Sequence, residues 1–143
     1  MAKLKWISVI LMMIPFLGLS QTLENLDYVS PFHENLAAVQ KNEQWAFVDQ
    51  EGNVVVNFRS DVVSTKTSQG TYPIFSDGRC LIEMEKEGIS YFGYIDTSGK
   101  KIIEPKFLNA KNFENGKAIV LQLVKEVAGK NTALGKKVVY YKY

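Results

Sequence analysis

Two stretches decide the fold that this sequence predicts: Phe75-Ser-Asp-Gly-Arg-Cys-Leu-Ile82 and Phe92-Gly-Tyr-Ile-Asp-Thr-Ser-Gly-Lys-Lys-Ile-Ile103. The first, called block A, places a glycine before a strand, and glycine reaches the left-handed backbone angles of a tight turn without strain. The second, called block B, alternates aromatic residues with small or aliphatic ones, then reverses in an aspartate-to-glycine turn. Together the two blocks predict antiparallel strands joined by tight turns.

Both blocks recur in the chain, which is typical of a repeat array. Block A also occurs as Phe32-His-Glu-Asn-Leu-Ala-Ala-Val39 and Phe113-Glu-Asn-Gly-Lys-Ala-Ile-Val120, and block B as Trp45-Ala-Phe-Val-Asp-Gln-Glu-Gly-Asn-Val-Val-Val56. Asparagine replaces glycine in one turn, since it is among the few residues that tolerate left-handed angles. The shared structural positions are Phe32, Phe75 and Phe113, then Asn35, Gly78 and Gly116, then Trp45 and Phe92, and finally Asp49, Asp96, Gly52 and Gly99.

The length of 143 residues suits one domain. We predict an all-β, antiparallel hairpin or meander array over residues 21–143, with about two and a half units at about 26–56, 72–107 and 108–143, the last incomplete. In the third unit, Tyr141-Lys142-Tyr143 stands where Phe92-Gly93-Tyr94 stands in the second. We expect Asn57–Ile74 to be a surface loop, with at most a short edge strand at Asp61–Ser64. Because proline cannot donate to a strand ladder, we expect Ile102–Phe107 to leave the sheet.

The first twenty residues have the layout of a cleavable signal peptide. Lys3 and Lys5 precede the apolar stretch Trp6–Leu17, and small residues follow up to an expected cleavage after Ser20. This stretch is shorter than a membrane-spanning helix and contains Pro15. We therefore expect a secreted or periplasmic protein that keeps no stable membrane anchor after cleavage.

The units resemble the WG repeat family of bacterial proteins. That family's pattern is a phenylalanine, an acidic residue and a glycine before a strand, then Trp-Gly-Tyr-Ile-Asp-x-x-Gly-Lys and an apolar pair with proline. The second unit follows this pattern from Phe92 to Pro105, with phenylalanine in place of tryptophan, whereas the first unit keeps Trp45 but has Ala46 in place of glycine. The resemblance covers about Leu26 to the C-terminus. It implies a β-rich, often exported repeat array, and it implies no catalytic residues, because the pattern contains none.

The residues suited to catalysis or metal binding occupy ordinary places in the units. His33 is in a turn position held elsewhere by Ser76 and Glu114, and Cys80 is in a strand position held elsewhere by alanine. We therefore predict no enzyme, no cofactor and no metal site, with Cys80 as a small buried hydrophobe. Asp49 and Asp96 could be read as a carboxylate pair or calcium ligands, but their equal places in two turns favour a structural role.

The charge and the aromatic residues bear on partners. The chain has 17 basic and 15 acidic residues, and Lys3 and Lys5 supply the excess, so the remainder is neutral and does not predict nucleic-acid binding. We expect a module for protein–protein interaction or envelope structure, with a protein partner or self-association through an open edge strand. Two alternatives are an enzyme with a dispersed site and a cell-wall glycan-binding module that uses repeated aromatic residues. These residues, expected mainly in the core, are Trp45, Phe47, Phe92, Tyr94, Tyr140, Tyr141 and Tyr143, with Tyr72 and Tyr91 expected to be exposed.

Overall fold

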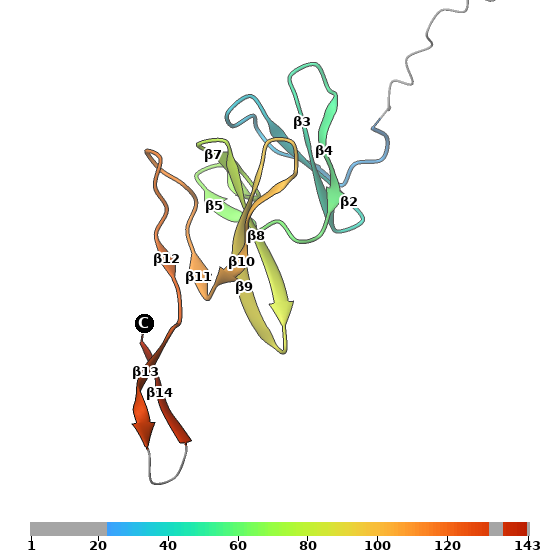
Figure 1. Ribbon diagram of the computed structural model, residues 1–143. Helices are drawn as coiled ribbons and strands as arrows, with labels where there is room; N and C mark the ends of the chain where they lie inside the picture. Colours follow the sequence, from blue (N-terminus) through green and yellow to red (C-terminus); the bar gives the residue numbers. More distant parts are fainter. Residues whose placement is uncertain (1–22, 132–135, 143) are drawn as a thin grey trace, which may run out of the picture.

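The computed structural model describes residues 23–131 and 136–142, and all regular structure in this part of the chain is β (Figure 1). The predicted all-β, antiparallel fold is confirmed. The signal peptide expected in residues 1–20 lies outside the described residues. The strands are β1 (Tyr28–Val29), β2 (Ala37–Lys41), β3 (Gln44–Val48), β4 (Val54–Arg59), β5 (Thr65–Thr67), β6 (Gly70–Tyr72), β7 (Phe75–Ser76), β8 (Arg79–Lys86), β9 (Ile89–Asp96), β10 (Lys101–Phe107), β11 (Asn109–Ala110), β12 (Val120–Leu121), β13 (Val124–Asn131) and β14 (Lys136–Lys142).

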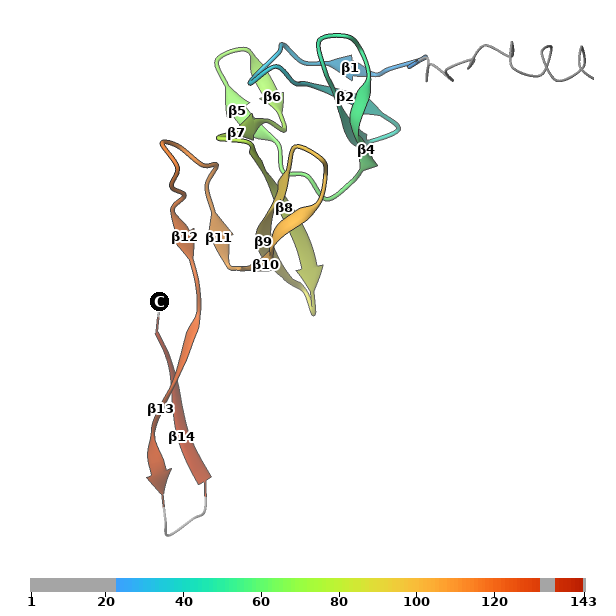
Figure 2. The ribbon, with the colours of Figure 1, turned by 45° about the horizontal axis from the view of Figure 1, so that its top comes forward.

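Each of the first two units forms a four-stranded antiparallel meander. The strand order is β1-β2-β3-β4 in the first sheet and β10-β9-β8-β7 in the second. Block A pairs with block B at the same register in both, because Ala38 lies opposite Phe47 and Leu81 lies opposite Tyr94. Figures 1 and 2 show the sheets following one another along the array, with the β13–β14 hairpin extending away from them.

The turn of block A has the type I′ geometry that suits antiparallel strands. The predicted left-handed angles are confirmed, since φ is 64° at Asn35, 68° at Gly78 and 75° at Gly116. The residue before each of these is left-handed as well, which was not predicted. These preceding residues are Glu34, Asp77 and Asn115, with φ of 49°, 50° and 53°.

Block B ends in the predicted aspartate-to-glycine turn. The carboxylate of Asp96 accepts hydrogen bonds from the amides two and four residues further on, at 2.9 and 3.1 Å. The turn then reverses at Gly99, where φ is 81°. The first unit repeats this arrangement with the carboxylate of Asp49 and with Gly52 at a φ of 85°. The two aspartates therefore act in separate turns as backbone acceptors.

These turns predict a loss of stability in acid. Hydrogen bonds from the Ser98 hydroxyl, and then from the Ser98 and Lys100 amides, lower the pKa of Asp96 below its ordinary value of 3.8. The unfolded chain therefore binds the proton more tightly, so this stabilisation is present above pH 3.8 and is lost as the pH falls through the lower folded pKa. Asp96→Asn should weaken the acid dependence of the urea midpoint below pH 4, whereas Glu85→Gln, a change at an exposed strand residue, should leave it unaltered. Equal acid dependence in the wild type and Asp96→Asn would contradict this role.

The expectation that Pro105 takes Ile102–Phe107 out of the sheet is wrong. β10 stays paired with β9 as far as Phe107, which lies opposite Phe92. The ladder shifts register on either side of Ile103, so the irregularity absorbs the missing amide of the proline. β10 is also an edge strand, where proline is tolerated.

This irregularity explains the glycine of block B in the second unit. A Cβ at Gly93 would lie 2.4 Å from the carbonyl oxygen of Ile103 and 2.7 Å from the nitrogen of Pro105. The backbone of β10 therefore occupies the space that any side chain at position 93 would need. The first unit has the fully buried Ala46 at this place, so β4 leaves room there for a methyl group.

The structure also differs from the surface loop expected over Asn57–Ile74. Val62 bridges to Ile82 of β8, within the short edge strand expected at Asp61–Ser64. The hairpin β5–β6 is then inserted before block A of the second unit. Tyr72 at the end of this hairpin is only 4% exposed, so the expectation that it is exposed is wrong. Burial of this tyrosine makes the insertion part of the packed structure.

Apolar clusters connect the units because alternate residues of each strand point to opposite faces of its sheet. A cluster between the first two sheets contains Ala38, Phe47, Val56, Val62, Phe75, Cys80, Ile82 and Ile95. A second lies between the second sheet and the third unit, and contains Leu81, Tyr94, Phe107 and Ala110 with Phe113 and Ala118. A third lies on the outer face of the first sheet, where Leu23 and Leu26 pack against Ala37, Val39, Ala46 and Val48.

Candidate interaction surfaces

The phenylalanine that opens block A packs on the block B aromatic of the preceding unit. Phe75 meets Phe47 edge to face with ring centroids 4.6 Å apart, and Phe113 meets Tyr94 in the same way at 4.8 Å. Such pairs contribute about 0.5–1.5 kcal/mol beyond their burial. Phe32 opens block A of the first unit and is 53% exposed, whereas Phe75 is 1% exposed. The structure thus makes two of the three predicted phenylalanines into contacts between units.

A second row of contacts links the turns of block A. The Glu34 carboxylate accepts hydrogen bonds from the amides of Asp77 and Gly78 at 2.7 and 2.9 Å. The Asp77 carboxylate in turn accepts one from the amide of Gly116 at 2.7 Å. Each acidic turn residue therefore binds the turn of the next unit. The sequence carries a signal for this in the acidic residue before Asn35 and Gly78, but its partner lies a whole unit away.

His33 and Ser76 add a third contact between units. His33 Nδ1 lies 2.7 Å from the carbonyl oxygen of Phe75, and Ser76 Oγ donates to the carbonyl oxygen of Phe113 at 2.6 Å. Since a carbonyl only accepts, the proton of this imidazole must reside on Nδ1. The chain's single histidine therefore joins the block A turn of the first unit to the backbone of Phe75 in the second unit.

The contacts between turns predict a measurable loss of stability. Glu34→Ala removes a carboxylate that accepts two amides, so we expect it to lower the free energy of unfolding by about 1 kcal/mol. The matched control is Glu43→Ala, because Glu43 is also an exposed turn residue with positive φ, at 63° against 49° for Glu34. Urea unfolding should separate the two variants. Equal stabilities would show that the carboxylate of Glu34 adds nothing to the stacking.

Cys80 is fully buried at the boundary between the first two sheets. Burial raises the pKa of its thiol to about 12, so the folded protein carries almost no thiolate at neutral pH. Because the thiolate is the reactive form, we expect no reaction with Ellman's reagent at pH 8 until urea unfolds the chain. Cys80→Ala supplies the blank, since alanine fills the equivalent positions 37 and 118. Rapid labelling of the folded wild type would contradict the buried site.

An aromatic surface lies beside the first sheet. Tyr28 packs edge-on against Trp45 with ring centroids 5.9 Å apart, and lies 6.1 Å from Tyr72 of the inserted hairpin. Tyr28 is 36% exposed and Trp45 is partly buried. A partly open cluster of this kind offers a face on which a sugar ring can stack. The side chains of Tyr140, Tyr141 and Tyr143, the other aromatic residues considered for this role, lie outside those that the structure describes.

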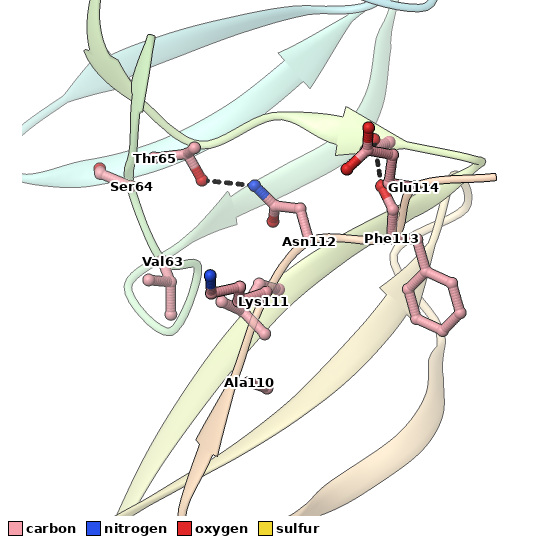
Figure 3. Close-up of a pocket in the computed structure, with 10 residues that line it drawn as sticks. Val63, Ser64, Thr65, Ala110, Lys111, Asn112, Phe113 and Glu114 are labelled. Carbon is pink, nitrogen blue, oxygen red and sulfur yellow. Dashed lines mark hydrogen bonds between the residues drawn. The ribbon is translucent and has the colours of Figure 1, made fainter. Parts of the chain in front are cut away.

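A groove of about 520 Å³ separates the inserted hairpin from the third unit (Figure 3). Asn112 Nδ2 donates to Thr65 Oγ1 across it at 2.8 Å, and Ser76 donates to the Phe113 carbonyl at its side. These polar groups therefore join the hairpin and the second unit to the third unit. The groove therefore shows how the insertion is attached to the third unit.

Among the side chains that the structure describes, those of residues 23–124, no three His, Cys, Asp or Glu come together as a metal site would require. The same part of the chain has no helix with the length and apolarity needed to cross a membrane. Asp49 and Asp96 are the two carboxylates considered for calcium. Each accepts hydrogen bonds from backbone amides of its own turn.

Comparison with known proteins agrees with the repeat pattern. A family model described as WG containing repeat matches residues 25–45 and 92–122. No curated protein and no solved structure matches the chain. The first matched segment contains block A of the first unit, and the second contains block B of the second unit followed by block A of the third. These two segments support the WG repeat family for this β-repeat protein.

Proposed function

We propose that this protein is a non-enzymatic, exported β-repeat module that binds another protein or has a structural role in a bacterial envelope. The observation that supports binding is the exposed apolar segment of the third unit that leads into β12. Ile119 is 73% exposed, whereas its equivalents Ala38 and Leu81 are 2% and 5% exposed. Large exposed apolar residues in a packed array favour a protein interface. The layout of residues 1–20 supports export.

Chemical cross-linking tests this function directly. The full-length gene is expressed in a bacterial host, the cells are fractionated, and the processed chain is cross-linked in the envelope fraction. We expect the chain to begin at Gln21 and to form one discrete cross-linked species with a protein. Size-exclusion chromatography with light scattering then separates a homo-oligomer from a complex with another protein. A chain that stays in the cytoplasm, or is a monomer without a cross-linked species, would contradict the proposal.

The second candidate function is glycan binding by the cluster of Tyr28, Trp45 and Tyr72. It is favoured by the partial exposure of Tyr28 beside the indole of Trp45. A chain that begins at Gln21 retains Trp45 as its single tryptophan, so its fluorescence reports on this cluster alone. Cell-wall saccharides should quench it, and Tyr28→Ala should abolish the effect. Unchanged fluorescence with peptidoglycan fragments would reject this function.

A further inference from the structure

The strand of block A is paired differently in the third unit. In the first unit β2 lies between β1 and β3. In the second unit β8 lies between β9 and the segment around Val62. Among the described strands, β12 pairs with β11 alone. The side of β12 on which the other two units place block B is therefore an open edge.

The side chains along this edge are exposed as well. Val120 is 39% exposed, whereas its equivalents Val39 and Ile82 are each 1% exposed. Leu121, the next residue in β12, is 40% exposed. Together with Ile119, which directly precedes β12, these residues form an exposed apolar segment with one edge uncovered. At the opposite end of the array, Leu23 and Leu26 cover the outer face of the first sheet.

The hairpin β13–β14 does not fill this edge. Lys142 lies opposite Val124, and Tyr141 lies opposite Lys125. In the second unit Phe92 lies opposite Glu83, whose equivalent in the third unit is Leu121. The expected equivalence of Tyr141-Lys142-Tyr143 with Phe92-Gly93-Tyr94 would therefore place Tyr141 opposite Leu121. The structure therefore contradicts that equivalence, and β14 leaves the edge of β12 uncovered.

We propose that the open edge of Ala118–Leu121 is an acceptor site for a block B strand of another polypeptide. This proposal rests on the proposed function and names its partner by chemistry: an extended segment with the order aromatic, small, aromatic, aliphatic and aspartate. Addition of a strand to an open edge is an established mode of peptide recognition, in which backbone hydrogen bonds give affinity and alternate side chains give specificity.

The two complete units show how such a strand fits. An incoming Phe or Tyr lies opposite Ile119, as Phe47 lies opposite Ala38. An incoming Ala or Gly lies opposite Val120, as Gly93 lies opposite Ile82. Cross-strand neighbours share a face, so the incoming aromatic ring covers the side chain of Ile119.

The charges at the end of this strand also match. In the second unit Arg79 lies opposite Asp96, the aspartate that starts the turn of block B. The equivalent of Arg79 in the third unit is the exposed Lys117. The aspartate of an incoming block B would thus lie opposite a lysine, and opposite charges at this position stabilise a strand pair.

The backbone hydrogen bonds identify the groups that an incoming strand would use. The carbonyl oxygens of Ile119 and Leu121 accept from the amides of Lys111 and Leu108 at 3.0 and 2.7 Å, toward β11. Neighbouring residues of a strand direct their own amide and carbonyl groups to opposite sides of the strand. The amide of Val120 therefore points to the open edge, where the proposal places its acceptor.

The test uses the chain from Gln21 onward and an acetylated, fluorescent peptide with the sequence of residues 89–100, which carries block B from Phe92 to Asp96. We expect saturable binding by fluorescence polarisation and slower hydrogen exchange at the amide of Val120. Ile119→Asp should weaken binding at least tenfold. Ile102→Asp on the edge strand β10 is the matched control, since Ile102 is also an exposed isoleucine, and it should bind like the wild type.

Specificity is tested with a second peptide in which lysine replaces the residue equivalent to Asp96, which should bind more weakly because it would lie opposite Lys117. Absence of saturable binding, or equal binding by Ile119→Asp and the wild type, would overturn the proposal. A dimer that Ile119→Asp converts to a monomer, without peptide binding, would also overturn it in favour of pairing between two copies. A cross-linked envelope partner that survives Ile119→Asp would leave the proposed function standing with a different surface.

Discussion

Replacing Phe75 by alanine is expected to lower the free energy of unfolding by about 4 kcal/mol, because it empties a closely packed site between two units. Phe75 is 1% exposed, and its ring meets that of Phe47 at 4.6 Å. The change removes both the buried ring and the edge-to-face contact. Urea unfolding followed by the fluorescence of Trp45 measures the effect.

The matched control is Phe32→Ala, since Phe32 has the same place in block A but is 53% exposed. We expect this variant to lie within about 0.5 kcal/mol of the wild type. The contrast tests whether the phenylalanine stabilises its own turn or the unit before it. Equal losses at both positions would assign the stability to the turn and contradict a stacking role for Phe75.

Replacing Gly93 by alanine is expected to cost about 3 kcal/mol, since a single Cβ enters space held by backbone. The nearest atom is the carbonyl oxygen of Ile103 at 2.4 Å, so β10 must move and lose part of its pairing with β9. A flexible side chain could rotate away from such a contact, but the backbone next to Pro105 cannot. Urea unfolding measures the loss, and hydrogen exchange should show it concentrated in β10.

Gly88→Ala is the control for the conformational effect of removing a glycine. Gly88 has a φ of 77°, and a Cβ added there would have nothing within 4 Å, so alanine meets only backbone strain, of about 1 kcal/mol. We expect Gly93→Ala to be the more damaging change although its backbone is not left-handed. A larger loss of stability from Gly88→Ala than from Gly93→Ala would show that β10 moves away from the added Cβ at little cost.

Much of the local structure could be predicted from the sequence. The left-handed residues at Asn35, Gly78 and Gly116, and the turn acceptors Asp49 and Asp96, follow from the backbone preferences of single residue types. The burial of Cys80 follows from the alanines at the same place in the other units. Each of these features depends on residues close together in the chain, and the same residue pattern occurs in more than one unit.

The contacts between units could not be predicted in this way. The carboxylate of Glu34 reaches the turn at Gly78, and the ring of Phe47 reaches Phe75, so both partners depend on how the sheets stack. The path of β10 past Pro105 was predicted wrongly, because a propensity against strand pairing says nothing of a bulge at a sheet edge. The buried Tyr72 was also missed, since its cover comes from Tyr28 of another unit.

The sequence by itself determined the all-β class, the repeated blocks and the turns that join their strands, because local backbone energetics and a period of two suffice for these. The tertiary structure alone decided which repeated residues link the units, why Gly93 admits no side chain, and which edge of the third unit is open. The physical reason is the separation along the chain over which each interaction acts. Turn and strand preferences act within a few residues, whereas packing and strand pairing depend on segments that only folding brings together.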